Sequence, residues 1–220
     1  MSGNFPGHDF CQYDEREKLR TRKKQFAGNS FKEFKAEFVR KAIHALIAFT
    51  PSLAALDRSG TALLLMGGIL FYTCMESLRF LGFSPPLFSA VASAAMRKRE
   101  RESFALGPVT LGLGALLTLI LFPPQPAAAA IYVLAFGDST SGLYGRFLGR
   151  IRPAFLQGKS LEGSLVCFSV SFLAGFLVFG EWQTALAVSL AATIVDALPL
   201  GDLDNILIPL AAGLAALLFH

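Results

Sequence analysis

The chain has 220 residues, of which 53% are hydrophobic and only 16% are charged, and its mean hydropathy is +0.52. This composition excludes an ordinary soluble domain and indicates a protein that crosses a membrane several times. The formal net charge of +4 is less informative than its distribution along the chain. Cys11, Cys74 and Cys167 lie far apart without C-x-x-C spacing, so the sequence predicts neither a disulfide framework nor a zinc site.

Residues 1–36 form a polar, basic arm that we expect to be partly disordered and cytoplasmic, attracted to anionic lipid. The arm has no signal-peptide pattern. Phe31, Phe34 and Phe38 recur at helical spacing, which is typical of a short amphipathic helix lying along the lipid headgroups.

Seven apolar runs follow the arm, and we compare them with the ~20 residues that a helix needs to cross a bilayer. We expect a single all-α bundle of about seven transmembrane helices over residues 37–220. Asp196 and Pro199 interrupt the sixth run, and interrupted spans often mark a site built into the membrane. The runs are 39–56, 61–81, 104–122, 127–147, 163–180, 183–200 and 203–219.

The basic residues predict the orientation of these spans. Ten of the 20 Lys and Arg residues lie between Arg16 and Lys41, and most of the others follow the second and fourth runs. Only Arg58 lies on the opposite side. The positive-inside rule therefore predicts a cytoplasmic N-terminus and an external C-terminus. Nearly every unexpected polar residue then falls on the cytoplasmic side, where we expect the active site.

Asp138 is an acid within the fourth apolar run, and such a residue is costly and indicates a functional site. Ser141, Gly145 and Gly149 follow at four-residue spacing as a stripe poor in side chains, and Gly142 lies beside them. The basic residues Arg146, Arg150, Arg152 and Lys159 come next. An acid, a glycine stripe and a basic exit together indicate Mg²⁺ and phosphate at a membrane surface. Alternatively, Asp138 pairs with an arginine between helices, and the glycines only permit close packing.

Glu37, Arg40, Lys41 and His44 lie on one helical face at the start of the first run. One interpretation is a phosphate clamp of Arg40 and Lys41, with His44 as a donor to phosphate or an acid–base group near a hydroxyl. The other is ordinary basic flanking of a membrane helix.

Lys159, Ser160, Glu162 and Gly163 resemble a fragment of a phosphate-binding loop, although the chain has no Walker A motif. At a helix start, Lys159 and the backbone N–H groups suit phosphate, and Glu162 suits a metal ion. Ser160 could equally be an ordinary helix cap.

The last predicted turn is surrounded by Asp196, Asp202, Asp204 and Asn205. Asp196 together with Asp138 could hold Mg²⁺ between spans four and six. A hydrophilic turn is the plainer interpretation of Asp204 and Asn205. Residues 97–102 are interpreted as a charged cytoplasmic loop. The sequence contains no nucleophile triad spacing, zinc-protease helix or nucleic-acid module, so no nucleic-acid partner is predicted.

Four motifs in matching order over about residues 37–219 together resemble the polyprenol kinase family of dolichol kinases, phytol kinases and CTP-dependent diacylglycerol kinases. They are R-K-x-x-H, G-D-S-T-S-G-x-x-G-R-x-x-G-R, K-S-x-E-G-S and D-N-I-L-I-P-L. The resemblance implies transfer of a phosphoryl group from a nucleoside triphosphate, commonly CTP, to a lipid alcohol. Ser141, where the family usually has Ala, and Asp196, where it often has Glu, are mild departures.

The expected roles combine these motifs with the resemblance. Asp138, Glu162, Asp196 and Asp204 are the candidate Mg²⁺ ligands, and Asp138, His44, Lys159 and Glu162 are the candidate catalytic residues. The candidate nucleotide-binding residues are Gly142, Gly145, Arg146, Gly149, Arg150, Lys159, Ser160, Gly163 and Asn205.

Two other functions stay open. The related phosphatidate cytidylyltransferases share part of the motif around Asp138, but they typically carry a different C-terminal signature and lack R-K-x-x-H. A non-enzymatic carrier of anionic lipid is the other alternative. The sequence does not indicate the lipid alcohol or the oligomeric state.

Overall fold

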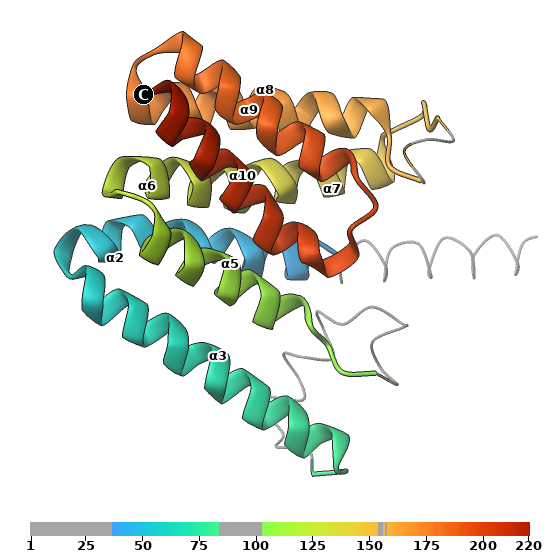
Figure 1. Ribbon diagram of the computed structural model, residues 1–220. Helices are drawn as coiled ribbons and strands as arrows, with labels where there is room; N and C mark the ends of the chain where they lie inside the picture. Colours follow the sequence, from blue (N-terminus) through green and yellow to red (C-terminus); the bar gives the residue numbers. More distant parts are fainter. Residues whose placement is uncertain (1–36, 84–102, 154–155, 157) are drawn as a thin grey trace, which may run out of the picture.

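The computed structural model describes residues 37–83, 103–153, 156 and 158–220. All secondary structure in these ranges is helical, and the helices form one bundle (Figure 1). The predicted all-α membrane fold is confirmed, because each of the seven apolar runs forms a helical segment. The predicted arm, residues 1–36, and the charged loop, residues 97–102, lie outside the described residues.

The segments follow the predicted runs with small shifts at their ends. The first span is the helix Glu37–Leu56, and the fourth span runs without a break through α6, η3 and α7. The elements, in chain order, are η1 (Leu46–Phe49), α2 (Thr50–Leu56), α3 (Arg58–Phe80), α5 (Gly107–Leu121), α6 (Pro124–Tyr132), η3 (Val133–Asp138), α7 (Ser139–Phe147), α8 (Leu161–Phe179), α9 (Trp182–Ala197), η5 (Gly201–Leu203) and α10 (Asp204–Phe219).

Four helices in the described part are long and apolar enough to cross a membrane: Glu37–Leu56, Arg58–Phe80, Leu161–Phe179 and Gly201–Phe219. Gly107–Leu121 and Trp182–Ala197 are shorter apolar helices. The lengths of the four long helices match the hydrocarbon thickness of a bilayer, which is about 30 Å, or ~20 helical residues.

Local sequence explains several helix ends. Prolines occupy the first turns of α2, α5 and α6, where their missing N–H group costs no hydrogen bond. The Ser160 hydroxyl caps α8 by accepting a hydrogen bond from the Gly163 N–H. Gly180 ends α8 with a φ of 71°, a left-handed conformation that favours glycine.

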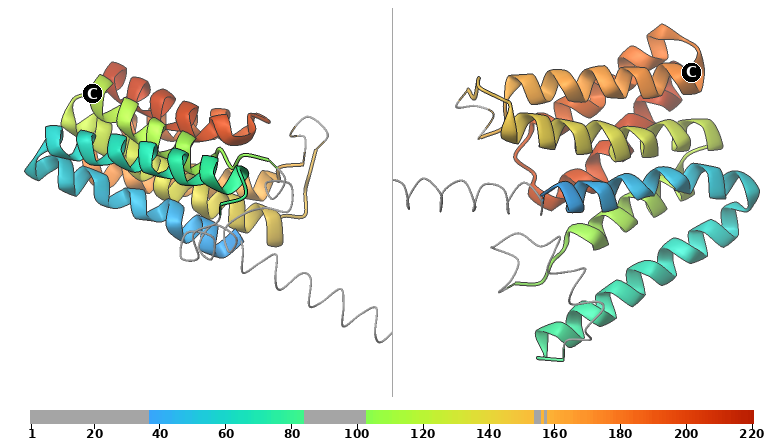
Figure 2. Two further views of the ribbon diagram at one scale, coloured as in Figure 1. Left: turned by 90° about the horizontal axis from the view of Figure 1, so that it is seen from below. Right: turned by 180° about the vertical axis from the view of Figure 1, so that it is seen from behind.

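The core lies where α10 packs against α9 and the fourth span (Figure 2). Its residues are mostly small, including Ala130, Ala192 and Ala212, which lets the helices approach closely. By contrast, α3 lies at one side of the bundle, packs against α5 and α2, and exposes a row of large apolar side chains. Those side chains suit contact with lipid.

The first span, α5, α8 and α10 begin at the same end of the bundle, and α7 and α9 finish there (Figures 1 and 2). Segments that are distant in the sequence therefore bring their polar terminal residues together at this end.

Candidate active site

A cavity of about 280 Å³ opens at this end of the bundle. This volume is close to the lower limit of the ~300–1,000 Å³ that is typical of small-molecule sites. Basic and acidic side chains line the cavity in equal number, so the formal charges of its wall sum to zero. The basic residues are Arg40, Lys41, Arg146, Arg152 and Lys159, and the acidic residues are Glu37, Asp138, Asp196, Asp202 and Asp204.

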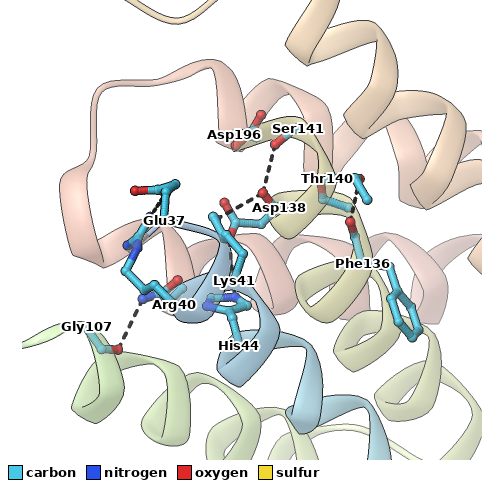
Figure 3. Close-up of polar contacts among 12 residues, drawn as sticks. Glu37, Arg40, Lys41, His44, Gly107, Phe136, Asp138, Thr140, Ser141 and Asp196 are labelled. Atoms are coloured by element: carbon cyan, nitrogen blue, oxygen red, sulfur yellow. Dashed lines mark hydrogen bonds and ion pairs between the residues drawn. The ribbon is translucent and has the colours of Figure 1, made fainter. Parts of the chain in front are cut away.

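Asp138 is held by a lysine from the first span. The Nζ of Lys41 lies 2.6 Å from Asp138 Oδ2 and 3.1 Å from the Asp138 carbonyl oxygen. His44 Nε2 lies 3.2 Å from the same Oδ2 without forming an aligned hydrogen bond. All three side chains are buried, and Figure 3 shows Lys41 and His44 reaching Asp138 from below. Asp138 therefore does pair between helices, with a lysine instead of the arginine considered from the sequence.

The backbone at Asp138 is π-helical. Residues Val133–Asp138 form η3, inserted between two α-helical stretches of the fourth span. π-helical turns are rare and occur frequently at functional sites. Hydropathy does not distinguish π from α conformation, so this feature could not be predicted from the sequence.

Lys159 forms a second pair, with Asp196 of α9. Its Nζ donates to the Asp196 carbonyl oxygen and lies 3.4 Å from Asp196 Oδ1. Asp196 is buried, whereas Lys159 is about one-third exposed. Asp138 and Asp196 thus each have their own lysine in this structure, although they line the same cavity.

The predicted metal ligands are only partly brought together. Among the described residues, no group of three or more His, Cys, Asp and Glu side chains could hold a metal ion by itself. Asp202 and Asp204 line the cavity, and neither side chain has a hydrogen bond or an ion pair within the described ranges. Because Mg²⁺ usually takes one or two carboxylates together with phosphates and waters, these two acids fit an ion that a nucleotide would bring.

Glu37 joins two arginines at the cavity. Its Oε1 lies 2.5 Å from Arg40 Nη2, and its Oε2 lies 2.9 Å from Arg146 Nη1. Glu37 is buried, whereas the Arg146 side chain is 43% exposed. One carboxylate therefore connects the first span to α7 and forms ion pairs with two guanidinium groups that could otherwise bind phosphate.

The predicted glycine stripe has two structural roles. A Cβ on Gly142 would lie 2.9 Å from Lys41 Cε, so this glycine leaves room for the lysine that reaches Asp138. A Cβ on Gly145 would lie 2.8 Å from Ser160 Oγ and 3.3 Å from Gly163 Cα. Gly145 and Gly163 therefore allow α7 and α8 to pack closely, as the packing alternative predicted, and they also line the cavity.

Glu162 lies outside the set of residues that line the cavity. Its carboxylate accepts hydrogen bonds from the backbone N–H groups of Arg150 and Ile151, at 3.0 Å each from Oε1. Arg150 and Gly149 also lie outside the lining. In this structure Glu162 holds the backbone of the loop between α7 and α8, and it belongs to no metal-binding group of three or more side chains among the described residues.

Asn205 lines the cavity while it ties two helices together. Its Nδ2 donates to Thr110 Oγ1 at 3.0 Å and to the Gly107 carbonyl oxygen at 3.3 Å. The amide thus fixes the start of α10 against the start of α5.

Three charged residues that line the cavity were not among the predicted site residues: Glu37, Arg152 and Asp202. Arg152 donates from Nη2 to the Gly145 carbonyl oxygen at 3.0 Å and from Nη1 to the Gly158 carbonyl oxygen at 3.1 Å. The signals for Glu37 and Asp202 were present, because Glu37 shares a helical face with Lys41 and Asp202 is two residues from Asp204. Arg152 belongs to the basic stretch that follows Asp138 in the sequence, but it was given no role of its own.

Comparison with known proteins identifies relatives that match most of the chain. A probable chloroplastic phytol kinase of Triticum aestivum is 28% identical over 200 residues, which cover 81% of this chain and 66% of the relative. The CTP-dependent diacylglycerol kinase 1 of Schizosaccharomyces pombe is 26% identical, covering 68% of this chain and 70% of the relative. The chain is thus similar to lipid kinases of both names, and these relatives support a lipid kinase family for it.

Phytol kinase 1 of Arabidopsis thaliana is also similar, with 29% identity, and the match covers 67% of this chain and 55% of that protein. The chain spans 66%, 63% and 65% of the lengths of three cereal relatives, all named as probable phytol kinases. No protein-family model matches the chain. No solved structure matches it either.

Proposed function

We propose that this protein is an integral-membrane kinase that transfers the γ-phosphoryl group of a nucleoside triphosphate, CTP, to the hydroxyl of a lipid alcohol. The acceptor classes are polyprenols, phytol-like alcohols and diacylglycerol. One observation carries the proposal: a charged cavity at the end of an apolar helical bundle contains two lysines, each beside a buried aspartate. Such a cavity suits a polyanion that must meet a membrane lipid.

The basic side chains would hold the triphosphate. Lys41 and Lys159 offer compact charges, and Arg40 and Arg146 offer planar donors that match phosphate oxygens. In this structure each of them is neutralised by an acid of the same cavity, so binding of the nucleotide would exchange carboxylate for phosphate. Phosphoryl transfer depends mainly on positioning and charge stabilisation, which these groups would supply.

Asp204 and Asp202 would hold Mg²⁺, because their carboxylates line the cavity without another partner in the described ranges. When bound, Mg²⁺ neutralises charge on the phosphate oxygens. Asp138 and Asp196 lie on the same cavity, and their lysines would keep the phosphates close to them.

The lipid hydroxyl would react beside Asp138. Its oxygen would bond to the γ-phosphorus while the bond to the nucleoside diphosphate breaks, and its proton would pass to Asp138 or His44. These two groups lie 3.2 Å apart, so either can serve the same hydroxyl. The names of the relatives support a kinase with a lipid acceptor, and the fission yeast name supports CTP as the donor.

The test uses purified protein in lipid nanodiscs with Mg²⁺ and CTP labelled at either the α or the γ phosphate. The lipid panel contains phytol, a polyprenol, diacylglycerol and phosphatidate, with an acceptor-free reaction as the control. Label from the γ position on an alcohol supports the proposal. Label from the α position on phosphatidate would indicate a cytidylyltransferase, and no transfer from either position would indicate a carrier.

We also propose that the cavity faces the cytoplasm, because most basic residues flank this end of the bundle. A cysteine introduced at Gly158, in a variant without the native cysteines, should then react with a membrane-impermeant thiol reagent only after the membrane is opened. A cysteine at Asp57, at the opposite end, is the matched control and should react in intact cells. The reverse pattern would contradict this orientation.

A further inference from the structure

Two apolar grooves lie on either side of a stacked pair of aromatic rings on the fourth span. The rings belong to Tyr132 and Phe136, and their centroids are 6.3 Å apart. The first groove, of about 380 Å³, lies between these rings and the first span. The second, of about 500 Å³, lies between the rings and α8. The first groove is lined from the first span by Ala42, Ala45, Leu46, Ala48, Phe49 and Ser52.

Both walls of the first groove lead to the Lys41–Asp138 pair. On the first span, the lining ends at Ala42, and Lys41 is the next residue toward the cavity. On the fourth span, the lining ends at Phe136, and Asp138 follows two residues later. Since Lys41 and Asp138 are in contact and also line the charged cavity, the pair lies between an apolar groove and a polar cavity.

The length of the groove suits a chain from one leaflet. From Ala42 to Ser52 it extends about 15 Å at ~1.5 Å per helical residue, which is half of the ~30 Å hydrocarbon thickness. The small side chains of three alanines on the first span leave room for a ligand in the groove. The rings of Phe49, Tyr132 and Phe136 line it as well. A straight or branched hydrocarbon chain fits such a surface.

We propose that the first groove binds the hydrocarbon chain of the lipid-alcohol acceptor and directs its hydroxyl to Asp138 and His44. This inference rests on the proposed function, since it deepens the assignment of the acceptor. Binding of the chain can be measured without turnover, so the two proposals can fail separately.

The binding test places a single tryptophan in each groove. Trp182 is the only tryptophan of the chain, so the W182F variant has no tryptophan fluorescence of its own. In that background, F49W reports on the first groove and L177W, an exposed residue of α8, reports on the second. Each variant is reconstituted in vesicles and titrated with a brominated long-chain primary alcohol. A brominated phospholipid measures quenching by bulk lipid.

The expected result is saturable quenching of F49W by the alcohol, reversed by unbrominated phytol, with only the bulk-lipid level of quenching for L177W. Equal and non-saturating quenching at both positions would overturn the proposal, because the first groove would then hold ordinary bilayer lipid. Saturable quenching of L177W alone would also overturn it, in favour of the second groove.

A kinetic test fills each groove with a larger side chain. A45L should raise the KM for a long-chain alcohol about tenfold, because about two CH₂ groups of the chain would lose their burial. The KM for nucleotide should not change, and A42L is a second variant at the same groove. A174L, in the second groove, is the matched control and should leave transfer to a single-chain alcohol unchanged. Normal kinetics of both A45L and A42L would contradict the proposal.

Discussion

Lys41 Nζ and Asp138 Oδ2 lie 2.6 Å apart in the buried part of the bundle, although the two residues are 97 positions apart in the sequence. This contact joins the first span to the fourth, and both residues line the charged cavity. The pair therefore links the stability of the helix packing to the electrostatic character of the site.

Replacing Lys41 by methionine should destabilise the protein by about 3 kcal/mol, because it leaves the buried carboxylate of Asp138 without its cation. The measurement is the midpoint of thermal unfolding in detergent. The double variant K41M/D138N should recover most of the loss, since the uncompensated charge is gone. A single K41M variant as stable as the wild type would show that the carboxylate is already solvated or protonated.

E37Q should lower the KM for nucleotide by about three- to tenfold, corresponding to about 1 kcal/mol. Glu37 forms ion pairs with both Arg40 and Arg146, and removal of its charge gives the cavity wall one net positive charge. Steady-state kinetics at saturating lipid alcohol measure this change. A raised KM would mean instead that Glu37 holds the two arginines in position for the phosphates.

E162Q should retain most of the phosphoryl-transfer activity, with kcat/KM lowered by less than about tenfold. Its carboxylate accepts hydrogen bonds from the Arg150 and Ile151 N–H groups outside the cavity, and glutamine keeps an acceptor oxygen there. Complete loss of activity in a folded E162Q protein would support the metal-binding role suggested by the sequence.

G145A should destabilise the protein by about 1–3 kcal/mol, because its Cβ would meet Ser160 and Gly163 across the contact between α7 and α8. G67A is the control, since a Cβ at Gly67 of α3 meets no atom within 4 Å. That control should be neutral or slightly stabilising, as alanine has the higher helix propensity. Equal effects of the two substitutions on the unfolding midpoint would contradict the close packing at Gly145.

The positions of the spans could be predicted because only an apolar segment of about 20 residues can cross a bilayer as a helix. The seven apolar runs became seven helical segments, and the interruption near Pro199 became the end of α9 at Ala197. Because helix direction alternates along the chain, the sequence could also predict that several polar residues meet at one end of the bundle. These residues are Asp138, Lys159, Asp196, Asp204 and Asn205.

Individual partners could not be predicted, because they depend on the rotation and depth of helices that are distant in the sequence. The pairing of Lys41 with Asp138 and that of Lys159 with Asp196 are of this kind. The π-helical backbone before Asp138 has no signature in the pattern of apolar residues. Glu162 was assigned to metal from its motif, and only the geometry reveals its backbone partners.

The central claim is that phosphoryl transfer occurs at the cavity beside Asp138, and D138N tests it most directly. The measurement is transfer of γ-labelled phosphate from CTP to a lipid alcohol by the purified variant, after its unfolding midpoint has shown that it is folded. D57N, an acid at the opposite end of the bundle, is the matched control. We predict that D138N lowers transfer by about 10³-fold and that D57N has wild-type activity. A folded D138N variant with the activity of the D57N control would contradict the account.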